Sequence, residues 1–589
     1  YSQELTLDCM QSFTMGTSRR AAWEFQLPVG QGKYVSLQID YEIDEIRNSA
    51  YLKFTRKPTD GDDILADDVP AKLILRPDVE ARCNHEVTKA YSGAEERFPA
   101  SLSVYQDGFD FAPYGNRLSM RLAGGSYVPE PEWMYMVDLP VEASRGLEAA
   151  SDLFSPGYFS VELMGGGCAN LCAAVDTECR ADAPVSTGEL PAVVSFEELV
   201  RSAIVPYVVK RDDLSTVIAG YPWFLDWGRD TLICLRGMIA AGMLEQSRAI
   251  LQAFARFERN GTIPNMIRGG DDSNRDTSDA PLWLFTATAD YIKQAGPEVL
   301  QDDCGGRTLL EILLSIAENI QTGTPNGIYM DNETGLVFSP SHYTWMDTNY
   351  PAGTPRQGYP IEIQALWFAA LKLLTGHAED GKKWGKLADK VRLSIHELFM
   401  LENKDFLSDC LHCEPGQGAK AAVADDACRC NQLLALTLGA VDDPVIVKPV
   451  LTACEDLLIP GGIRSLADLP VEYPLPVYRD GVLLNDPEHP YWGVYAGDED
   501  TRRKPAYHNG TAWTWPFPSY CEALFMFGGE ACRKRALAVL MSSRELLQNG
   551  VPGQVPEVID GSAPHIQRGC GAQAWGVTEL FRVYKLIEK

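Results

Sequence analysis

The spacing of hydrophobic residues along this chain changes near residue 190. Before that point, apolar and polar residues alternate in short runs, such as 34–41, 102–105 and 158–163, and Gly, Pro and Asp separate the runs. A period of two is typical of half-buried β-strands, and the separating residues favour turns. The pattern predicts an antiparallel β-sandwich over residues 1–185.

From Ser195 onward, apolar residues recur at the i, i+3 and i+4 positions that mark one face of a helix. The predicted helices span residues 196–205, 231–257, 282–295, 309–320, 361–374, 383–398, 431–438, 446–458, 511–527, 532–548 and 572–587. Two long stretches between them, 321–360 and 460–510, lack this pattern and are rich in Trp, Tyr, Asp and Gly. Long irregular loops usually carry function. Helix pairs joined by such loops favour an (α/α)6 toroid, whose inner helices direct their N-terminal loops at one pocket.

The two patterns together predict a mainly α protein with a β N-terminal domain. We expect a β-sandwich at residues 1–185, a linker containing glycine and proline at 186–196, and the toroid at 197–589. The length of 589 residues fits this division, because it exceeds what a single hydrophobic core accommodates.

Charge and hydropathy exclude two classes of partner. The formal net charge of −29 would repel nucleic acid, and no run of Lys and Arg is long enough to override it. No apolar stretch reaches the roughly 18 to 20 residues of a membrane span. We therefore expect neither nucleic acid nor membrane as a partner. The sequence indicates nothing about oligomeric state.

The fifteen cysteines are scattered, and several lie in helical apolar patterns. This distribution is typical of reduced core thiols in a cytoplasmic protein. Two close pairs, Cys410 with Cys413 and Cys428 with Cys430, could form a structural zinc site. The second pair has only one intervening residue and runs into an apolar pattern. Free thiols are therefore favoured, zinc remains an alternative, and no other metal or cofactor is expected.

The segment 220–231, Gly-Tyr-Pro-Trp-Phe-Leu-Asp-Trp-Gly-Arg-Asp-Thr, gathers aromatic and charged residues directly before a helical pattern. Aromatic faces stack on sugar rings, and carboxylate and guanidinium groups hydrogen-bond paired hydroxyls. The segment therefore favours a carbohydrate-binding pocket. The alternative is a buried ion pair that caps a core helix. The candidate ligand-binding residues are Trp223, Asp226, Trp227, Arg229 and Asp230.

Several motifs, in order along residues 197–589, resemble the amylo-α-1,6-glucosidase domain of glycogen debranching enzymes. The motifs are Trp227-Gly-Arg-Asp-Thr, Asp279-Ala-Pro-Leu-Trp283, Thr344-Trp-Met-Asp347, Thr354-Pro-Arg356, Ile361-Glu-Ile363, Tyr507-His-Asn-Gly-Thr-Ala-Trp513, Pro556-Glu-Val-Ile-Asp560 and Gln573-Ala-Trp575. The resemblance implies a glucoamylase-like toroid that acts on glycogen or branched α-glucan oligosaccharides. It does not extend in detail to the first 185 residues.

Glycoside hydrolysis needs two carboxyl groups, one as acid and one as base or nucleophile. Asp347 has apolar neighbours, which raise the pKa of a carboxyl group and so suit a general acid. The catalytic base of the family falls on Glu557, and the family precedent implies an inverting single displacement. The alternative interpretations are a turn aspartate and a glutamate that flanks a helix.

The matching motifs also contain the remaining candidates for substrate contacts. These are Asp279, Trp283, Trp345, Arg356, Glu362, His508, Trp513, Gln573 and Trp575. Some of the tryptophans could instead belong to the core. Glu362 begins a predicted helix, where the helix dipole also favours a carboxylate.

The leading hypothesis is a hydrolase that removes α-1,6-linked glucose stubs from glycogen or limit-dextrin-type glucans. The alternatives are another toroid α-glucosidase, similar to glucoamylase or trehalase, and a non-catalytic glycan-binding protein. Eukaryotic members of the family also carry a glucanotransferase domain with a (β/α)8 barrel. No βα-repeating segment occurs here, so we expect this chain to lack that half.

Overall fold

The computed structural model describes residues 9–16, 20–44, 47–83, 86–182, 195–211, 214–350 and 353–589. The chain forms two compact units, Tyr1–Ser195 and Phe196–Lys589. Most of the expected linker, residues 186–194, lies outside the described residues.

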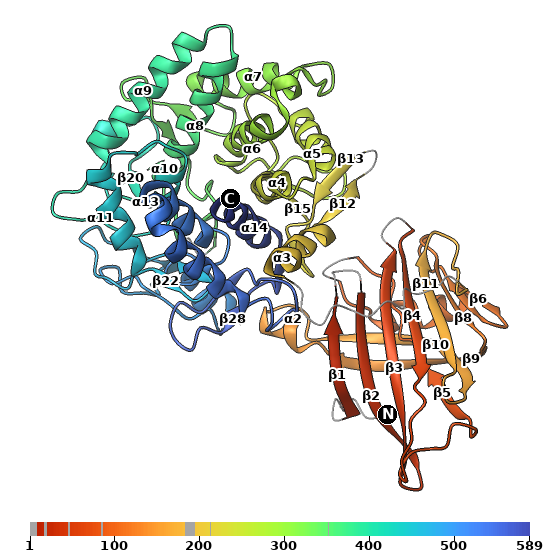
Figure 1. The fold of residues 1–589 in the computed structure, drawn as a ribbon. Helices are drawn as coiled ribbons and strands as arrows, with labels where there is room; N and C mark the ends of the chain where they lie inside the picture. The colour runs from red at the N-terminus through yellow and green to blue at the C-terminus, as the bar shows by residue number, and fades with distance from the viewer. Residues whose placement is uncertain are drawn as a thin grey trace. The chain divides into compact units, whose positions relative to one another are not determined.

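The N-terminal unit contains two antiparallel sheets (Figure 1). The strands of the larger sheet are, in spatial order, β1 (Met10–Met15), β2 (Arg20–Gly30), β3 (Lys33–Asp44), β4 (Ser49–Arg56), β11 (Cys168–Val175), β8 (Leu118–Ala123), β7 (Gly108–Phe111) and β6 (Leu102–Tyr105). Those of the smaller sheet are β5 (Ala71–Leu75), β10 (Ala150–Leu163) and β9 (Ser126–Asp138). Short helices α1 (Ala94–Ala100) and α2 (Pro140–Ser144) lie between strands.

Aromatic residues from both sheets form the core of this unit. Phe109 and Phe111 on β7 meet Phe159 and Phe154 on β10, with ring centroids 6.1 Å apart in each pair. All four side chains are buried. Alternate residues of each strand therefore face a shared interior, which confirms the predicted antiparallel sandwich.

The second unit is a closed double ring of helices (Figure 1). The inner helices are α4 (Gly228–Ala240), α6 (Ala280–Ala295), α8 (Ile361–His377), α10 (Gln432–Thr437), the first part of α13 (Phe517–Leu540) and α14 (Ala574–Glu588). Each contacts the next, and α14 contacts α4, so the ring closes. The outer helices are α3 (Phe196–Ile204), α5 (Leu244–Arg256), α7 (Leu309–Thr322), α9 (Gly381–Leu398), α11 (Pro444–Glu455) and the part of α13 after its kink at Gly529. This arrangement confirms the predicted (α/α)6 toroid.

Burial explains why the inner helices are apolar on nearly every side. Most residues of α4 and α8 are buried, because each inner helix packs between two inner neighbours and at least one outer helix. Outer helices such as α5 and α9 keep one exposed polar face. Within the described residues, no helix combines the length and the apolar character that crossing a bilayer requires.

Short strands tie together the loops that precede the inner helices. β26 (Ala512–Trp513) lies between β23 (Gly462–Arg464) and β27 (Val558–Ile559), and Trp513 pairs with Val558. β14 (Gly220–Tyr221) pairs with β29 (Ala572–Gln573), which joins the loop before α4 to the loop before α14. Residues hundreds of positions apart are thereby held at the same end of the ring.

Candidate active site

A pocket of about 80 Å³ lies where the inner helices begin. It is lined by Phe224, Trp227, Arg229, Asp230, Trp345, Asp347, Tyr507, Trp513, Glu557, Gln573 and Trp575. These residues come from the first turns of α4 and α14 and from the segments before α4, α8, α13 and α14. The N-termini of helices carry partial positive charge, so this end of the ring favours carboxylates and polar ligands.

Asp347, in the loop before α8, is held by Arg229 at the start of α4. Arg229 Nη1 donates to Asp347 Oδ2 at 2.9 Å, and Nε donates to Asp279 Oδ2 at 2.6 Å. Nη2 donates to the carbonyl of Thr344 at 3.0 Å. The Arg229 side chain is 3% exposed and that of Asp347 is 32% exposed. The guanidinium therefore fixes Asp347 from its buried side and leaves the carboxyl group accessible to the pocket.

The pocket contains three carboxyl groups that influence one another. Burial raises the pKa of Asp347 above its usual range, although the neighbouring guanidinium of Arg229 opposes the shift. Burial also raises the pKa of Asp230 to about 7; Arg229 opposes this shift, and the charges of Asp347 and Glu557 add to it. A carboxyl group with a raised pKa keeps its proton nearer to neutral pH, as a general acid must.

Glu557, just before β27, is buried and accepts hydrogen bonds at both carboxylate oxygens. The Tyr507 hydroxyl donates to Oε1, and the backbone N–H of Cys570 donates to Oε2 at 2.9 Å. Its own backbone N–H donates to the carbonyl of Cys570 at 2.7 Å. Two donors stabilise the negative charge of the carboxylate and fix its orientation. Hydrogen bonds thus hold the Glu557 carboxyl group at both of its oxygens.

Aromatic side chains form the walls of the pocket. Trp513 contacts Trp345 edge to face at 5.1 Å between ring centroids, Trp575 at 6.0 Å and Tyr507 at 4.7 Å. Because these rings pack against one another, their positions are fixed before any ligand enters. A rigid aromatic wall beside carboxyl groups is suited to a sugar ring, which has apolar C–H faces and polar edges.

Two polar atoms in this wall have no protein partner. Gln573 Oε1 and Trp575 Nε1 are buried and make no hydrogen bond within the part of the chain that the structure describes. Both residues line the pocket. Buried polar atoms usually have a partner, so an acceptor and a donor are available here for ligand hydroxyls.

The structure brings only some of the candidate residues into the pocket lining. Those that line it are Trp227, Arg229, Asp230, Trp345, Asp347, Trp513, Glu557, Gln573 and Trp575. Those that lie outside it are Trp223, Asp226, Asp279, Trp283, Arg356, Glu362 and His508. For the segment 220–231, the sequence offered a carbohydrate-binding pocket or a buried ion pair. Arg229 fits both, because it lines the pocket and forms a buried ion pair with Asp279.

Most residues outside the lining have protein partners. Asp226 accepts a hydrogen bond from Arg211 Nη1 at 2.5 Å, and Asp279 accepts from Arg229. Trp283 is buried edge to face against Trp515, with ring centroids 6.3 Å apart. Asp226, Asp279 and Trp283 therefore contact other parts of the protein and do not line the pocket.

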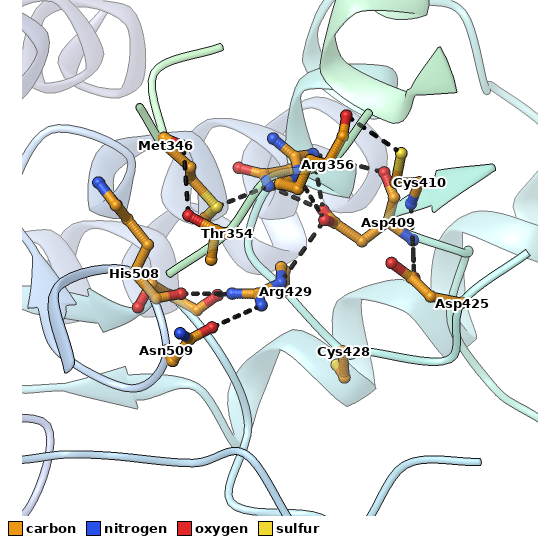
Figure 2. A network of polar contacts seen from close by, with 12 residues as sticks. Met346, Thr354, Arg356, Asp409, Cys410, Asp425, Cys428, Arg429, His508 and Asn509 are labelled. Carbon is orange, nitrogen blue, oxygen red and sulfur yellow. Dashed lines mark hydrogen bonds and ion pairs between the residues drawn. The ribbon is translucent and has the colours of Figure 1, made fainter. Parts of the chain in front are cut away.

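Arg356 belongs to a buried polar network with Asp409 and Arg429 (Figure 2), and Glu362 joins it through Arg356. Arg356 donates to Glu362 at 2.5 and 2.6 Å and to Asp409 at 2.6 and 3.0 Å. Its Nη1 also reaches the Thr344 hydroxyl at 3.0 Å. Since the carbonyl of Thr344 accepts from Arg229, the network braces the segment that carries Asp347.

His508 lies at the other side of this network. Its carbonyl accepts a hydrogen bond from Arg429, and its ring stacks on Trp513 at 5.0 Å and 8°. Burial and the charge of Arg429 hold the pKa of His508 well below its usual range. A neutral, stacked ring fits a packing role behind the wall.

The cysteine pairs have contacts of their own. Cys410 Sγ lies 3.5 Å from the carbonyl of Arg356, and Cys428 Sγ accepts from Gln432 at 3.8 Å. No group of three or more His, Cys, Asp or Glu side chains among the described residues is placed to hold a metal ion. The zinc alternative therefore has no geometric support.

Two lining residues, Phe224 and Tyr507, were absent from the candidates. Both lie inside motifs that the sequence analysis quotes. Tyr507 could have been found from its position beside His508, but its hydrogen bond to Glu557 joins residues 50 positions apart and has no local signal.

Comparisons with known proteins identify the family of the chain and its fold. The family model described as amylo-alpha-1,6-glucosidase matches residues 201–582, and the model described as glycogen debranching enzyme N terminal matches residues 5–169. The glycogen debranching enzyme of Saccharomyces cerevisiae is 25% identical over 409 residues, which are 54% of this chain and 26% of the yeast protein. The chain thus matches only about a quarter of that relative's length.

Among solved structures, a bacterial glucoamylase crystallised with acarbose matches with a TM-score of 0.54 and 12% identity. The match covers 98% of this chain and 86% of that chain, and at this identity it establishes the fold alone. The first family model covers more than half of the sequence. The chain therefore belongs to the amylo-α-1,6-glucosidase family, whose members are glycosidases.

Proposed function

We propose that this protein removes α-1,6-linked glucose stubs from glycogen or limit-dextrin-type glucans. The observation that carries the proposal is the convergence of Asp347 and Glu557 on one aromatic pocket. Glycoside hydrolysis requires two carboxyl groups, one as acid and one as base or nucleophile. The proposed specificity for α-1,6 linkages rests on membership of the amylo-α-1,6-glucosidase family.

In the proposed mechanism Asp347 is the general acid. Arg229 occupies Oδ2, which leaves Oδ1 to hold the proton that passes to the glycosidic oxygen. Glu557 is the general base, and each of its oxygens retains a lone pair for the attacking water. Tyr507 and Cys570 hold this carboxylate in place while it takes the proton.

We propose inversion of configuration. A base that activates water needs a gap of roughly 6.5 to 9.5 Å between the two carboxyl groups, whereas a nucleophile needs roughly 5 to 5.5 Å. The choice of the wider gap rests on the family precedent of an Asp acid and a Glu base, and Asp347 and Glu557 lie on different loops around the same pocket.

The deciding experiment is incubation of the full chain with a maltooligosaccharide that carries one α-1,6-linked glucose. Free glucose and its first-formed anomer are followed by NMR. The proposal expects β-glucose as the initial product. Binding of the oligosaccharide without release of glucose would indicate a glycan-binding protein instead, and release from maltose or trehalose alone would indicate another toroid α-glucosidase.

We also propose the cytoplasm as the site of action. All fifteen cysteines are free thiols, and many are buried in the apolar core. Reduced thiols of this kind are typical of proteins in a reducing compartment, and glycogen is the substrate that the proposal places there.

Arg229→Lys is expected to lower both activity and stability. Lysine keeps the charge but cannot reach Asp279, Asp347 and the Thr344 carbonyl together, because its donors share one nitrogen. We expect a loss of about 10²-fold in kcat/KM from misplacement of Asp347. We also expect destabilisation by about 1–3 kcal/mol from incomplete pairing of buried carboxylates.

Kinetics and thermal unfolding of the same Arg229→Lys preparation separate the two effects. If activity per folded molecule equals that of the wild type, the ion pair is purely structural and Arg229 has no part in orienting the acid.

Gly569→Ala is expected to displace the proposed base. Gly569 has a φ of +66°, and an added Cβ would lie 2.4 Å from Glu557 Oε2. We expect a fall in kcat/KM of about 10²-fold, since displacement by about 1 Å is enough for such a loss.

Gly550→Ala is the matched control for Gly569→Ala. Its φ is +74°, and its Cβ would lie 2.3 Å from Oε1 of Gln567, which is outside the pocket lining. Similar kinetic losses in the two variants would show that backbone strain, and not the position of Glu557, explains the effect.

A further inference from the structure

Tyr350 is half exposed, yet its side chain is held from two directions. The residue is 53% exposed, and its hydroxyl donates to Asp480 Oδ1 at 2.6 Å. The guanidinium of Arg479 lies 5.9 Å from the ring centroid. Arg479 and Asp480 are 129 and 130 residues further along the chain, within the long irregular stretch 460–510.

The partners of Tyr350 are themselves fixed. Arg479 forms an ion pair with Asp500 at 2.8 Å. β24 (Tyr478–Arg479) and β25 (Val482–Leu483) form a hairpin whose turn contains Asp480. Holding an exposed aromatic side chain in one position costs side-chain entropy without the gain of burial. An exposed ring that is nonetheless fixed points to a binding role.

Tyr350 lies close to the proposed acid in the chain, outside the residues that line the pocket. It follows Asp347 by three residues, so the two Cα atoms are at most about 11 Å apart. A general acid protonates the oxygen of the leaving group, which places the departing part of the substrate near the acid. If the terminal glucose occupies the pocket, a ring this close to Asp347 and outside the lining is near the expected position of the leaving sugar.

The surroundings of the ring favour a neutral ligand. Arg479 is paired with Asp500, and Asp480 accepts from the Tyr350 hydroxyl, so no single charge dominates near the ring. An aromatic face with paired charges at its edge is suited to the C–H face of a pyranose. A charged ligand would find no unpaired counterpart among these residues.

We propose that Tyr350 is the stacking platform for the α-glucan chain that leaves when the glucose stub is cut. The inference rests on the proposed function and names the part of the substrate that this ring recognises. Tyr350 is a specificity-determining residue for the leaving chain and takes no part in the transfer of protons.

The hairpin offers a matched control. Tyr478 is 54% exposed, similar to Tyr350, and pairs with Leu483 across the hairpin. Arg479 and Val482 form the next pair, so they lie on the opposite face of the two strands. Arg479 is the residue that contacts the ring of Tyr350, and Tyr478 therefore points away from the proposed platform.

The test compares Tyr350→Ala, Tyr350→Phe and Tyr478→Ala on two substrates. The first substrate is the singly branched maltooligosaccharide, and the second is α-glucosyl fluoride, which has no leaving sugar. For Tyr350→Ala we expect kcat/KM on the oligosaccharide to fall about tenfold, the factor that corresponds to loss of one stacking contact. Hydrolysis of the fluoride is expected to stay unchanged. Tyr350→Phe retains the ring and most of the activity, and Tyr478→Ala resembles the wild type.

The other outcomes distinguish failure of the inference about Tyr350 from failure of the proposed function. An equal loss on both substrates would mean that Tyr350 acts on Asp347 or on the fold, which overturns the platform. No loss on the oligosaccharide, or an equal loss in Tyr478→Ala, also overturns it while leaving the proposed function intact. If the wild type hydrolyses the fluoride but not the oligosaccharide, the proposed substrate fails and the inference fails with it.

Discussion

Glu557→Gln is expected to lose hydrolysis by at least about 10²- to 10⁴-fold, because the variant has no group that can take a proton from water. The amide is nearly the same size as the carboxyl group, so the pocket keeps its shape. The amide oxygen can still accept from Cys570 N–H, and the amide nitrogen can donate to the Tyr507 oxygen, since a phenol also accepts. The loss is therefore chemical and not structural.

The stereochemical outcome gives a second readout for Glu557. A general base leaves no covalent intermediate, so mass spectrometry of wild type and Glu557→Gln during turnover is expected to find only unmodified protein. NMR of the wild-type reaction is expected to find β-glucose first. A protein adduct of one hexose, or α-glucose as the first product, would assign Glu557 the role of nucleophile.

Asp347→Asn is expected to reduce turnover of the branched oligosaccharide by about 10²- to 10⁴-fold, the scale of a positioned proton donor. Arg229 Nη1 can donate to the amide oxygen of the variant as it does to Oδ2 now, so glucan binding is expected to remain nearly intact. What disappears is the proton on a carboxyl group whose pKa burial raises.

Two controls separate loss of the acid from loss of an ion pair. Glucosyl fluoride needs no protonation of its leaving group, so Asp347→Asn is expected to recover much of its activity on that substrate. Asp290→Asn removes a similar arginine-paired carboxylate outside the pocket, 2.8 Å from Arg236 Nε. It is expected to lower the melting temperature while turnover per folded molecule is kept. Unchanged turnover of Asp347→Asn on the oligosaccharide would assign the acid to another residue.

The periodicity of apolar residues was sufficient to predict the fold class of both units. Its errors lie at element boundaries. The predicted helix at 231–257 is two helices, because the turn between α4 and α5 is also partly buried and continues the apolar spacing. The predicted helix at 511–527 begins six residues later, since Trp515 precedes Pro516 and residues before proline avoid the helical conformation.

Strand order could not be predicted from periodicity. In the N-terminal unit, β4 pairs with β11, which lies more than a hundred residues further along the chain. Alternation shows which face of each strand is buried but not which strand it pairs with. The match between Phe109 and Phe159 across the two sheets is likewise a property of the assembled core.

The candidate site was predictable to the extent that its motifs are local. Trp227, Arg229 and Asp230 lie together in the sequence and all line the pocket. Arg356 and Glu362 are also an arginine and a carboxylate close together in the sequence, like Arg229 and Asp230. They instead lie in a network that is completed by Asp409, 53 residues from Arg356. The sequence shows where charged residues that could bind a ligand lie along the chain. Long-range packing decides whether each of them faces the pocket or another side chain. The roles of the lining residues stay predictions until the variants are measured.

The closure of the inner ring by α14 has a consequence for the synthesis of this protein. Because α4 begins at Gly228 and α14 begins at Ala574, a ribosome adding about 5–20 residues per second needs roughly 20–70 s to pass from one to the other. Throughout that interval the nascent chain exposes the apolar flank of α4 that α14 later covers. Gln573 and Trp575 are still missing from the pocket, so its lining is incomplete. Exposed apolar surface of this kind makes a growing chain prone to aggregation until its last inner helix emerges.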